Sequence, residues 1–504
     1  MQRPSKNRAP APKYVSEKQL KFPGFESPFE RKLNPNNRWV VLSNLLPWDE
    51  LCSIYWKYLP EKETGRPSLN PRIVLGSLII KHLCDLDDRE TVDQISENIY
   101  MQYFLGYSSF NDEPPFNASL FVEFRKRLGL EEMEKINERV SRIKQELLEK
   151  QNKNSIKEKG EAEPPLDTTP THKGQLITDA TVCPQDIAYP TDIDLLNDAR
   201  EKSEELIDLL YPQSELQKKP RTYREKARKE YLKIAQKKTK SKKDIRTGLK
   251  QQLGYVGRNI RSIHRILGTL PTIPLKAKEY KYLLVIQHLY EQQRTMYTTK
   301  THSIEDRIVS IHQPHVRPIV RGKSKAKVEF GAKINVSLVD GITFIDDFSW
   351  DAYNEGTRLQ KSVGKYKQRM GYYPEEVLAD KICCTRENRA FLKEKGILLK
   401  AKPLGRPKKQ ALSNQVSPGE RNPIEGKFGQ AKTGYGLDRI KARLSQTSES
   451  WIASIILVLN LVHLAEVALL WIKVKIEILK LIAQKNTQTK FWSYAINKHK
   501  IMAA

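Results

Sequence analysis

Two strand-like segments lie on either side of a long basic segment that has the composition of helices. Residues 174–190 and 328–350 are rich in β-branched and aromatic residues, and Asp340-Gly341 within the second is a strong signal for a tight hairpin turn. Residues 216–300 interleave lysine and arginine with tyrosine and read as helix-forming, and we expect no apolar periodicity in the segment from about Gln217 to Arg265. We therefore expect an α/β fold of the mixed α+β type, in which a basic helical insertion interrupts a sheet.

The chain of 504 residues is too long for one ordinary hydrophobic core. We expect an irregular N-terminal segment, a helical domain, and a helix with a polar linker. A sheet-containing core divided by the insertion follows, and then a C-terminal helix with a tail. The corresponding ranges are 1–64, 65–130, 131–172, 173–215, 216–300, 301–450 and 451–504.

Helix-start signals support this division. Ser68 can cap a helix that has Pro71 in its first turn, and Thr191 with Asp194 resembles a capping box. The short helices expected in residues 65–130 suit a helix-turn-helix-like DNA-binding module. They suit a helical bundle for dimerisation equally well, so both alternatives stay open.

Residues 451–471 are nearly as long and as apolar as a membrane-spanning helix. They include Asn460, His463 and Glu466, which are costly in lipid. We therefore expect a buried core helix and no association with a membrane. The five cysteines match no zinc-binding spacing, and no apolar run follows the basic N-terminus, so a reduced, cytoplasmic chain is the expectation.

The charge balance points to a polyanionic partner. Lysine and arginine number 87 against 60 aspartate and glutamate residues, which gives a net charge of +27. We expect the partner to be double-stranded DNA. Four lysines of the insertion are expected to contact its phosphates: Lys237, Lys238, Lys242 and Lys243. The alternative for such a charge run is an ordinary solvated helix face.

Three acidic residues are candidates for chemistry. Asp179 ends the apolar QLITD, Asp380 ends VLAD, and Glu425 lies near the start of a helix. We expect both aspartates at strand tips, where the active sites of α/β folds gather. Glu425 and Lys432 are seven residues apart, so helix geometry places them within about 20° of each other around the axis.

Each of these acids also has a purely structural interpretation. Asp179 can cap a turn, and Asp380 can form an ion pair with Lys381. Glu425 is the third helical position if Asn422 is the N-cap, which is an ordinary capping arrangement.

Cutting and joining DNA strands would require carboxylates of this kind. The reaction needs an activated oxygen nucleophile and a stabilised leaving oxygen, and two Mg²⁺ ions about 4 Å apart provide both. Mg²⁺ prefers carboxylate oxygen, so Asp179, Asp380 and Glu425 are the candidate ligands. Arg421 and Lys432 can then hold DNA phosphates against the metal ions.

Several stretches, in the right order, resemble the DDE transposases of bacterial insertion sequences, in the group of insertion sequence five and its relatives. They are TDATVCPQDIAYPTDIDLL, HVRPIVRGKSKAKVEFGAKINVSLVDG, SWDAYNEG, ADKICCTRENRAFLKEKGI, PLGRP and RNPIEGKFGQAKTGYGLDRIKARL. The resemblance covers most of residues 65–475, including an N-terminal segment similar to the helical domain that precedes the catalytic core in that family. The last motif of the family has Tyr, Arg, Glu and Lys; here Arg421, Glu425 and Lys432 match, and Pro418 stands at the Tyr position.

The resemblance implies a ribonuclease-H-like core and a transposase that cleaves element ends and transfers their 3′ ends. It implies two Mg²⁺ ions, for which Mn²⁺ can substitute, at Asp179, Asp380 and Glu425. We further expect a homodimer that acts at the bacterial nucleoid. Two alternatives stay open: a catalytically inactive DNA-binding regulator of the same fold, and a metal-dependent nuclease without strand transfer.

Overall fold

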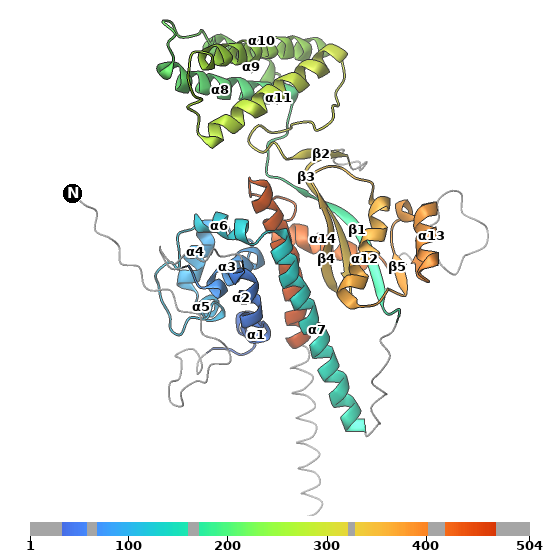
Figure 1. Cartoon of the computed structure of the whole chain (residues 1–504). Helices are drawn as coiled ribbons and strands as arrows, with labels where there is room; N and C mark the ends of the chain where they lie inside the picture. The colour runs from blue at the N-terminus through green and yellow to red at the C-terminus, as the bar shows by residue number, and fades with distance from the viewer. Residues whose placement is uncertain (1–32, 58–67, 160–170, 321–327, 402–418, 470–504) are drawn as a thin grey trace, which may run out of the picture.

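The computed structural model describes residues 33–57, 68–159, 171–320, 328–401 and 419–469. These residues form a mixed α/β structure with helices around a single sheet (Figure 1). The sequence-based expectations for the polar linker, the PLGRP stretch, Pro418 and the C-terminal tail fall largely or wholly outside the described residues.

Short helices form the N-terminal part of the described chain. They are α1 (Arg38–Leu45), α2 (Trp48–Trp56), α3 (Pro71–Leu83), α4 (Asp88–Glu97), α5 (Ile99–Phe104) and α6 (Leu120–Arg127). The expectation that residues 1–64 are irregular is wrong for α1 and α2, which are too short to show a clear helical period but bury Trp39 and Trp48 in the core. The cap of α3 is Asn70 rather than Ser68, with Pro71 in the first turn as expected.

Two long helices join these short helices to the rest of the molecule. They are α7 (Leu130–Lys159) and a C-terminal helix (Ser445–Leu469), which run side by side in Figure 1. The Asn460 side chain donates hydrogen bonds to Asn137 of α7 (2.6 Å) and to the Thr343 carbonyl (2.7 Å). The C-terminal helix is long and apolar enough to cross a membrane, but 72% of its most apolar stretch is buried inside the protein. The expectation of a buried core helix is confirmed.

Within the described residues, the sheet has six strands and mixed direction. Its strands are β1 (Gln175–Pro184), β2 (Arg317–Val320), β3 (Val328–Val339), β4 (Ile342–Ser349), β5 (Glu376–Leu378) and β6 (Leu398–Lys400). The order is β2-β3-β1-β5-β6, with β4 also pairing with β3. The hairpin between β3 and β4 turns at Asp340 and Gly341, both at positive φ, as expected.

Both faces of the sheet are covered. One face packs on the core that holds the N-terminal helices and the C-terminal helix. The other face packs on α12 (Leu359–Met370) and α13 (Arg386–Glu394). Helix α14 (Asn422–Tyr435) contacts β1 and buries Ile424 and Ala431. The candidate residues therefore lie on elements that the cores fix in place.

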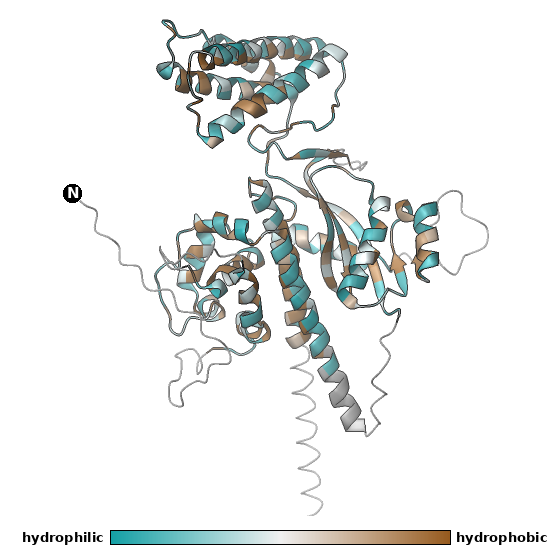
Figure 2. Cartoon of the chain, viewed as in Figure 1, coloured by the Kyte–Doolittle hydropathy of each residue, from teal (hydrophilic) through white to brown (hydrophobic). Residues whose placement is uncertain are grey.

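A group of helices stands apart from the sheet (Figure 1). It comprises α8 (Asp192–Leu210), α9 (Arg224–Ala235), α10 (Lys242–Leu267) and α11 (Ala277–Thr299). Helices α8, α10 and α11 share a hydrophobic core of their own, and α9 packs on α8 and α10. We call these four helices the helical unit. Each of them carries both hydrophilic and hydrophobic residues (Figure 2).

Two expectations about this region need correction. Helix α8, capped by Thr191 as expected, packs on α10 and α11 rather than on the sheet, so the helical unit begins before residue 216. We also expected the basic segment to lack an apolar period. Helix α10 has one, because Val256, Ile260 and Ile263 are buried on the face that meets α8.

Candidate active site

Asp179 lies in the middle of β1, opposite Val336 of β3, and not at a strand tip as expected. Strand β1 pairs with β3 along most of its length but with β5 only from Gln175 to Ile177. From Thr178 to Cys183 no described strand therefore pairs with the edge of β1 that faces β5, and the end of β1 is bridged to Ile440. The side chain of Asp179 is 18% exposed, and its Oδ1 accepts a hydrogen bond from the Ala180 N–H (2.8 Å).

The register of the parallel strands explains why Asp380 lies beside Asp179. Ile177 pairs with Leu378, so two further residues along each strand lead to Asp179 and Asp380. After β5 ends, Asp380 becomes the N-cap of the 3₁₀ helix η3 (Lys381–Cys383), and its Oδ1 accepts a hydrogen bond from the Lys381 N–H (2.7 Å). Its side chain is 47% exposed, so Asp380 faces the open side of the site.

Arg421 connects the two aspartates. Its Nη2 lies 3.0 Å from Asp179 Oδ2, and its Nη1 lies 3.5 Å from Asp380 Oδ1. Arg421 is the N-cap of α14, whereas a cap at Asn422 had been considered. Glu425 is therefore the fourth helical residue instead of the third, which removes the ordinary capping interpretation of Glu425.

All three candidate acids line one cleft with a volume of about 720 Å³. Arg421 and Lys432 line it too, together with Phe428 from the same face of α14. The structure thus brings together five of the predicted site residues from β1, the end of β5 and α14 with its N-cap. The charged lining of this cleft consists of Asp179, Lys333, Glu355, Asp380, Arg421, Glu425 and Lys432.

The electrostatics of the cleft favour a cation. Burial raises the pKa of Asp179, and the nearby carboxylates of Glu355 and Asp380 raise it further, while Arg421 acts in the opposite direction. A positive ion would relieve this crowding of negative charge, and carboxylate oxygens are donors that Mg²⁺ prefers. Among the described residues, no three acidic, histidine or cysteine side chains are grouped as a ready metal site. The Arg421 guanidinium lies between the two aspartates in this arrangement.

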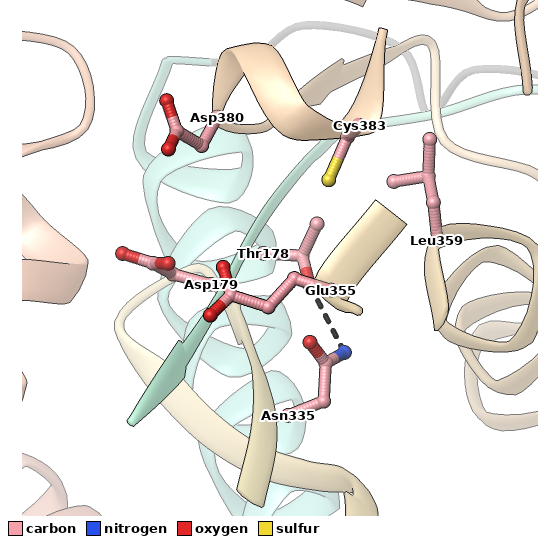
Figure 3. Close-up of a pocket in the computed structure, with 7 residues that line it drawn as sticks. All are labelled: Thr178, Asp179, Asn335, Glu355, Leu359, Asp380 and Cys383. Atoms are coloured by element: carbon pink, nitrogen blue, oxygen red, sulfur yellow. Dashed lines mark hydrogen bonds between the residues drawn. The ribbon is translucent and has the colours of Figure 1, made fainter. Parts of the chain in front are cut away.

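Sequence reasoning missed Glu355. It belongs to the 3₁₀ helix η2 (Glu355–Arg358) and lines the cleft as well as a smaller pocket beside Asp179 and Asp380 (Figure 3). Cys383 also lines the smaller pocket, where burial raises the pKa of its thiol to about 12. Glu355 lies in the SWDAYNEG stretch, which carries the family resemblance but shows no strand or helix pattern that would mark one residue in it.

The four lysines predicted to contact DNA lie elsewhere. Lys237 and Lys238 are exposed in the connection between α9 and α10, and Lys242 and Lys243 are exposed at the start of α10. Lys237 forms an ion pair with Asp244 (2.9 Å). These lysines belong to the helical unit and are not part of the cleft lining.

Comparisons with known proteins add two family matches. Residues 27–127 match a family described as a transposase domain, and residues 377–462 match one described as a transposase DDE domain. An uncharacterized protein of Rhizobium meliloti, ORF8 in the nfe locus, is 30% identical over 171 residues, which are 33% of this chain and 72% of that protein. No solved structure matches the chain. The second matched range contains Asp380, Arg421 and Glu425.

Proposed function

Because this chain belongs to the DDE transposases, a membership that indicates a role in DNA transposition, we propose that it cleaves DNA at the ends of its own element and transfers the freed 3′ ends to target DNA. One observation carries the proposal: Asp179, Asp380 and Glu425 come from three separate segments and line one cleft beside Arg421. DDE domains use divalent metal ions, and we propose that these three acids hold two Mg²⁺, with Mn²⁺ able to substitute.

The proposed reaction has two phosphoryl-transfer steps. In the first, a water oxygen bonds to the phosphorus at the element end, the bond to the 3′ oxygen breaks, and that oxygen leaves as a hydroxyl. In the second, this hydroxyl oxygen bonds to a target phosphorus while the target's own 3′ oxygen leaves. When bound, the metal ions supply the charge that activates the attacking oxygen and stabilises the leaving oxygen.

The residues of the chain have distinct parts in this proposal. Asp179 and Asp380 hold their positions through the register of β1 and β5, and Glu425 holds its position through the buried Ile424 beside it. Arg421 and Lys432 bind DNA phosphates, which suits a planar guanidinium and an ammonium that line the same cleft as the acids.

We extend the proposal to the fold and its parts. The mixed sheet, with β3 antiparallel to β1 and the acids on β1, after β5 and on α14, supports a ribonuclease-H-like core. The helices α3 to α6 serve DNA binding or dimerisation, and the helical unit contacts the DNA backbone through Lys237, Lys238, Lys242 and Lys243.

Replacing Glu425 by glutamine tests the proposal. The variant should lose cleavage of labelled element ends in Mg²⁺ by at least about 100-fold, because glutamine keeps the size of the side chain but removes a charged donor. A gel-shift assay should show nearly unchanged binding to the same DNA. Glu387→Gln is a matched control, since Glu387 is exposed in the first turn of α13 and outside the cleft lining.

Normal cleavage by Glu425→Gln would contradict the assignment of the third acid. Cleavage without joining to target DNA in the unaltered protein would favour a nuclease. Binding of element ends without cleavage, under any divalent ion, would favour an inactive regulator.

A further inference from the structure

The cleft contains one more carboxylate than the proposed function uses. We propose that Glu355 is a fourth metal-binding acid of this site and shares a divalent cation with Asp179 and Asp380. The inference rests on the proposed function, because it takes Asp179 and Asp380 as metal ligands. It concerns a residue of the chain, Glu355, to which neither the sequence motif nor the family matches give a role.

Position is the first argument. Glu355, Asp179 and Asp380 line the same small pocket, and in Figure 3 the side chain of Glu355 extends toward Asp179, with the three carboxylates on the same side of the view. Carboxylates that face one another in a partly buried space repel each other, and a shared cation is the usual way to stabilise them.

The surrounding backbone fixes this position. Helices η2 and η3 approach so closely that a Cβ on Gly356 would lie 2.6 Å from the Ile382 carbonyl oxygen, so only glycine fits beside Glu355. The buried Asn388 side chain donates hydrogen bonds to the carbonyl oxygens of Gly356 (2.7 Å) and Cys383 (3.0 Å). These contacts therefore hold the segment with Glu355 against the segment with Asp380. An exposed surface glutamate would not require its backbone to be fixed in this way.

The charge balance of the cleft is the third argument. Three cationic side chains line it: Lys333, Arg421 and Lys432. The three acids of the proposed function would only neutralise these three positive charges. With Glu355 as a fourth acid, the cleft has an excess of negative charge that a divalent ion can neutralise. Lys333 Nζ lies 2.9 Å from Glu355 Oε1, so lysine is the counter-ion of Glu355 when no metal is bound.

The competing explanation is that Glu355 serves only to neutralise Lys333. The two explanations differ in metal affinity. If Glu355 is a ligand, Glu355→Gln should weaken Mn²⁺ binding to the full-length protein by at least about tenfold, measured by electron paramagnetic resonance titration without DNA. If Glu355 only neutralises Lys333, the Mn²⁺ affinity should not fall.

The matched control is Glu375→Gln, which removes the same charge from an exposed residue just before β5, at the opposite end of that strand from Asp380. It should bind Mn²⁺ like the unaltered protein. Asp179→Asn is the reference for the proposed function. Loss of Mn²⁺ binding in Asp179→Asn with unchanged binding in Glu355→Gln would overturn this inference alone. Unchanged binding in both variants would contradict the proposed function as well.

A second measurement needs no variant and so does not depend on the folding of Glu355→Gln. Fe²⁺ bound in place of Mg²⁺ generates hydroxyl radicals with peroxide and ascorbate, and these cut the backbone near the ion. We expect cuts at residues 354–356 in addition to cuts near Asp179 and Asp380. Cuts near the two aspartates without any near Glu355 would overturn the inference, and the absence of cuts at all three would contradict the proposed function too.

Discussion

Arg421 shows how one residue can organise a site. Its planar guanidinium reaches two carboxylates, one on β1 and one just after β5, a geometry that a lysine ammonium does not match. Its stem is anchored because Arg421 is also the N-cap of α14. The same contacts that order the aspartates therefore couple them to the helix with Glu425.

Glu134 of α7 provides a prediction about pH and stability. Its carboxylate accepts a hydrogen bond from the Ile345 N–H (3.2 Å) and lies 3.3 Å from Arg369. Burial raises the pKa of Glu134 to about 7, which Arg369 and Lys365 oppose and Asp346 reinforces. The folded chain thus favours the protonated form, so ionisation costs stability as the pH rises from 4.5, the ordinary value, to about 7.

Glu134→Gln should remove this dependence. We expect the variant to be more stable than the unaltered protein by roughly 1 to 3 kcal/mol at pH 8, and the difference to vanish near pH 4.5. Urea unfolding at a series of pH values measures it. Glu146→Gln, a change at an exposed position of the same helix, should track the unaltered protein at every pH. Parallel pH curves for Glu134→Gln and the unaltered protein would refute the prediction.

At the residue scale, sequence reasoning reached the cleft only in part. In the sequence, Asp179 and Asp380 each follow a short apolar run. When these two runs are aligned as parallel strands, the two aspartates lie side by side. Glu425 was predicted as a site residue from the spacing of the last family motif, in which it stands between Arg421 and Lys432. Glu355 lies on a single 3₁₀ turn, which has no periodic pattern, and its place depends on Gly356 and Asn388 from distant parts of the chain.

At the scale of elements, long and strongly patterned segments were predicted well. The hairpin of β3 and β4, the cap of α8 and the buried C-terminal helix follow from local sequence alone. Helices α1 and α2 did not, because their burial depends on contacts with α3, α5 and α7. The packing of α8 with α10 also depends on tertiary contacts. For this reason the composition of the sequence placed the start of the helical insertion after α8, whereas α8 belongs to the helical unit.

The helical unit has a testable DNA-binding surface at the junction of α9 and α10. Replacing Lys237, Lys238, Lys242 and Lys243 by glutamine should reduce the slope of log affinity against log salt by up to about 3.6, since each phosphate contact contributes about 0.9. Fluorescence anisotropy with duplex DNA at several salt concentrations measures the slope. Helix α10 should stay folded, because its buried face, with Val256 and Ile263, is unchanged.

The control uses three exposed lysines near the start of α11: Lys276, Lys278 and Lys281. They follow the opposite end of α10, a helix of 26 residues that is about 39 Å long. If the control variant changes the slope less than the quadruple variant does, the DNA contact lies at the junction of α9 and α10. An unchanged slope in the quadruple variant would instead mean that the lysines form an ordinary solvated face.

At the scale of the whole molecule, the two ends of the described chain meet in one core. Trp451 of the C-terminal helix packs edge-on against His82 (4.9 Å between ring centroids) and lies under the Lys81 ammonium (4.6 Å from the ring). Arg125 of α6 lies 5.3 Å from the same ring. The same hydrophobic core continues to Ile334 and Val336 of β3, whereas the helical unit has a separate core.

This arrangement predicts two cooperative units. Trp451→Ala should cost about 3 to 5 kcal/mol, because a large buried ring leaves a cavity. Hydrogen exchange followed by mass spectrometry should then show faster exchange in α3, α6 and β3 together, with little change in α10 and α11. Leu289→Ala, in the core of the helical unit, should give the reverse pattern. If Trp451→Ala accelerates exchange equally in both regions, the molecule unfolds as one unit; if only the C-terminal helix responds, the shared core does not couple the chain ends.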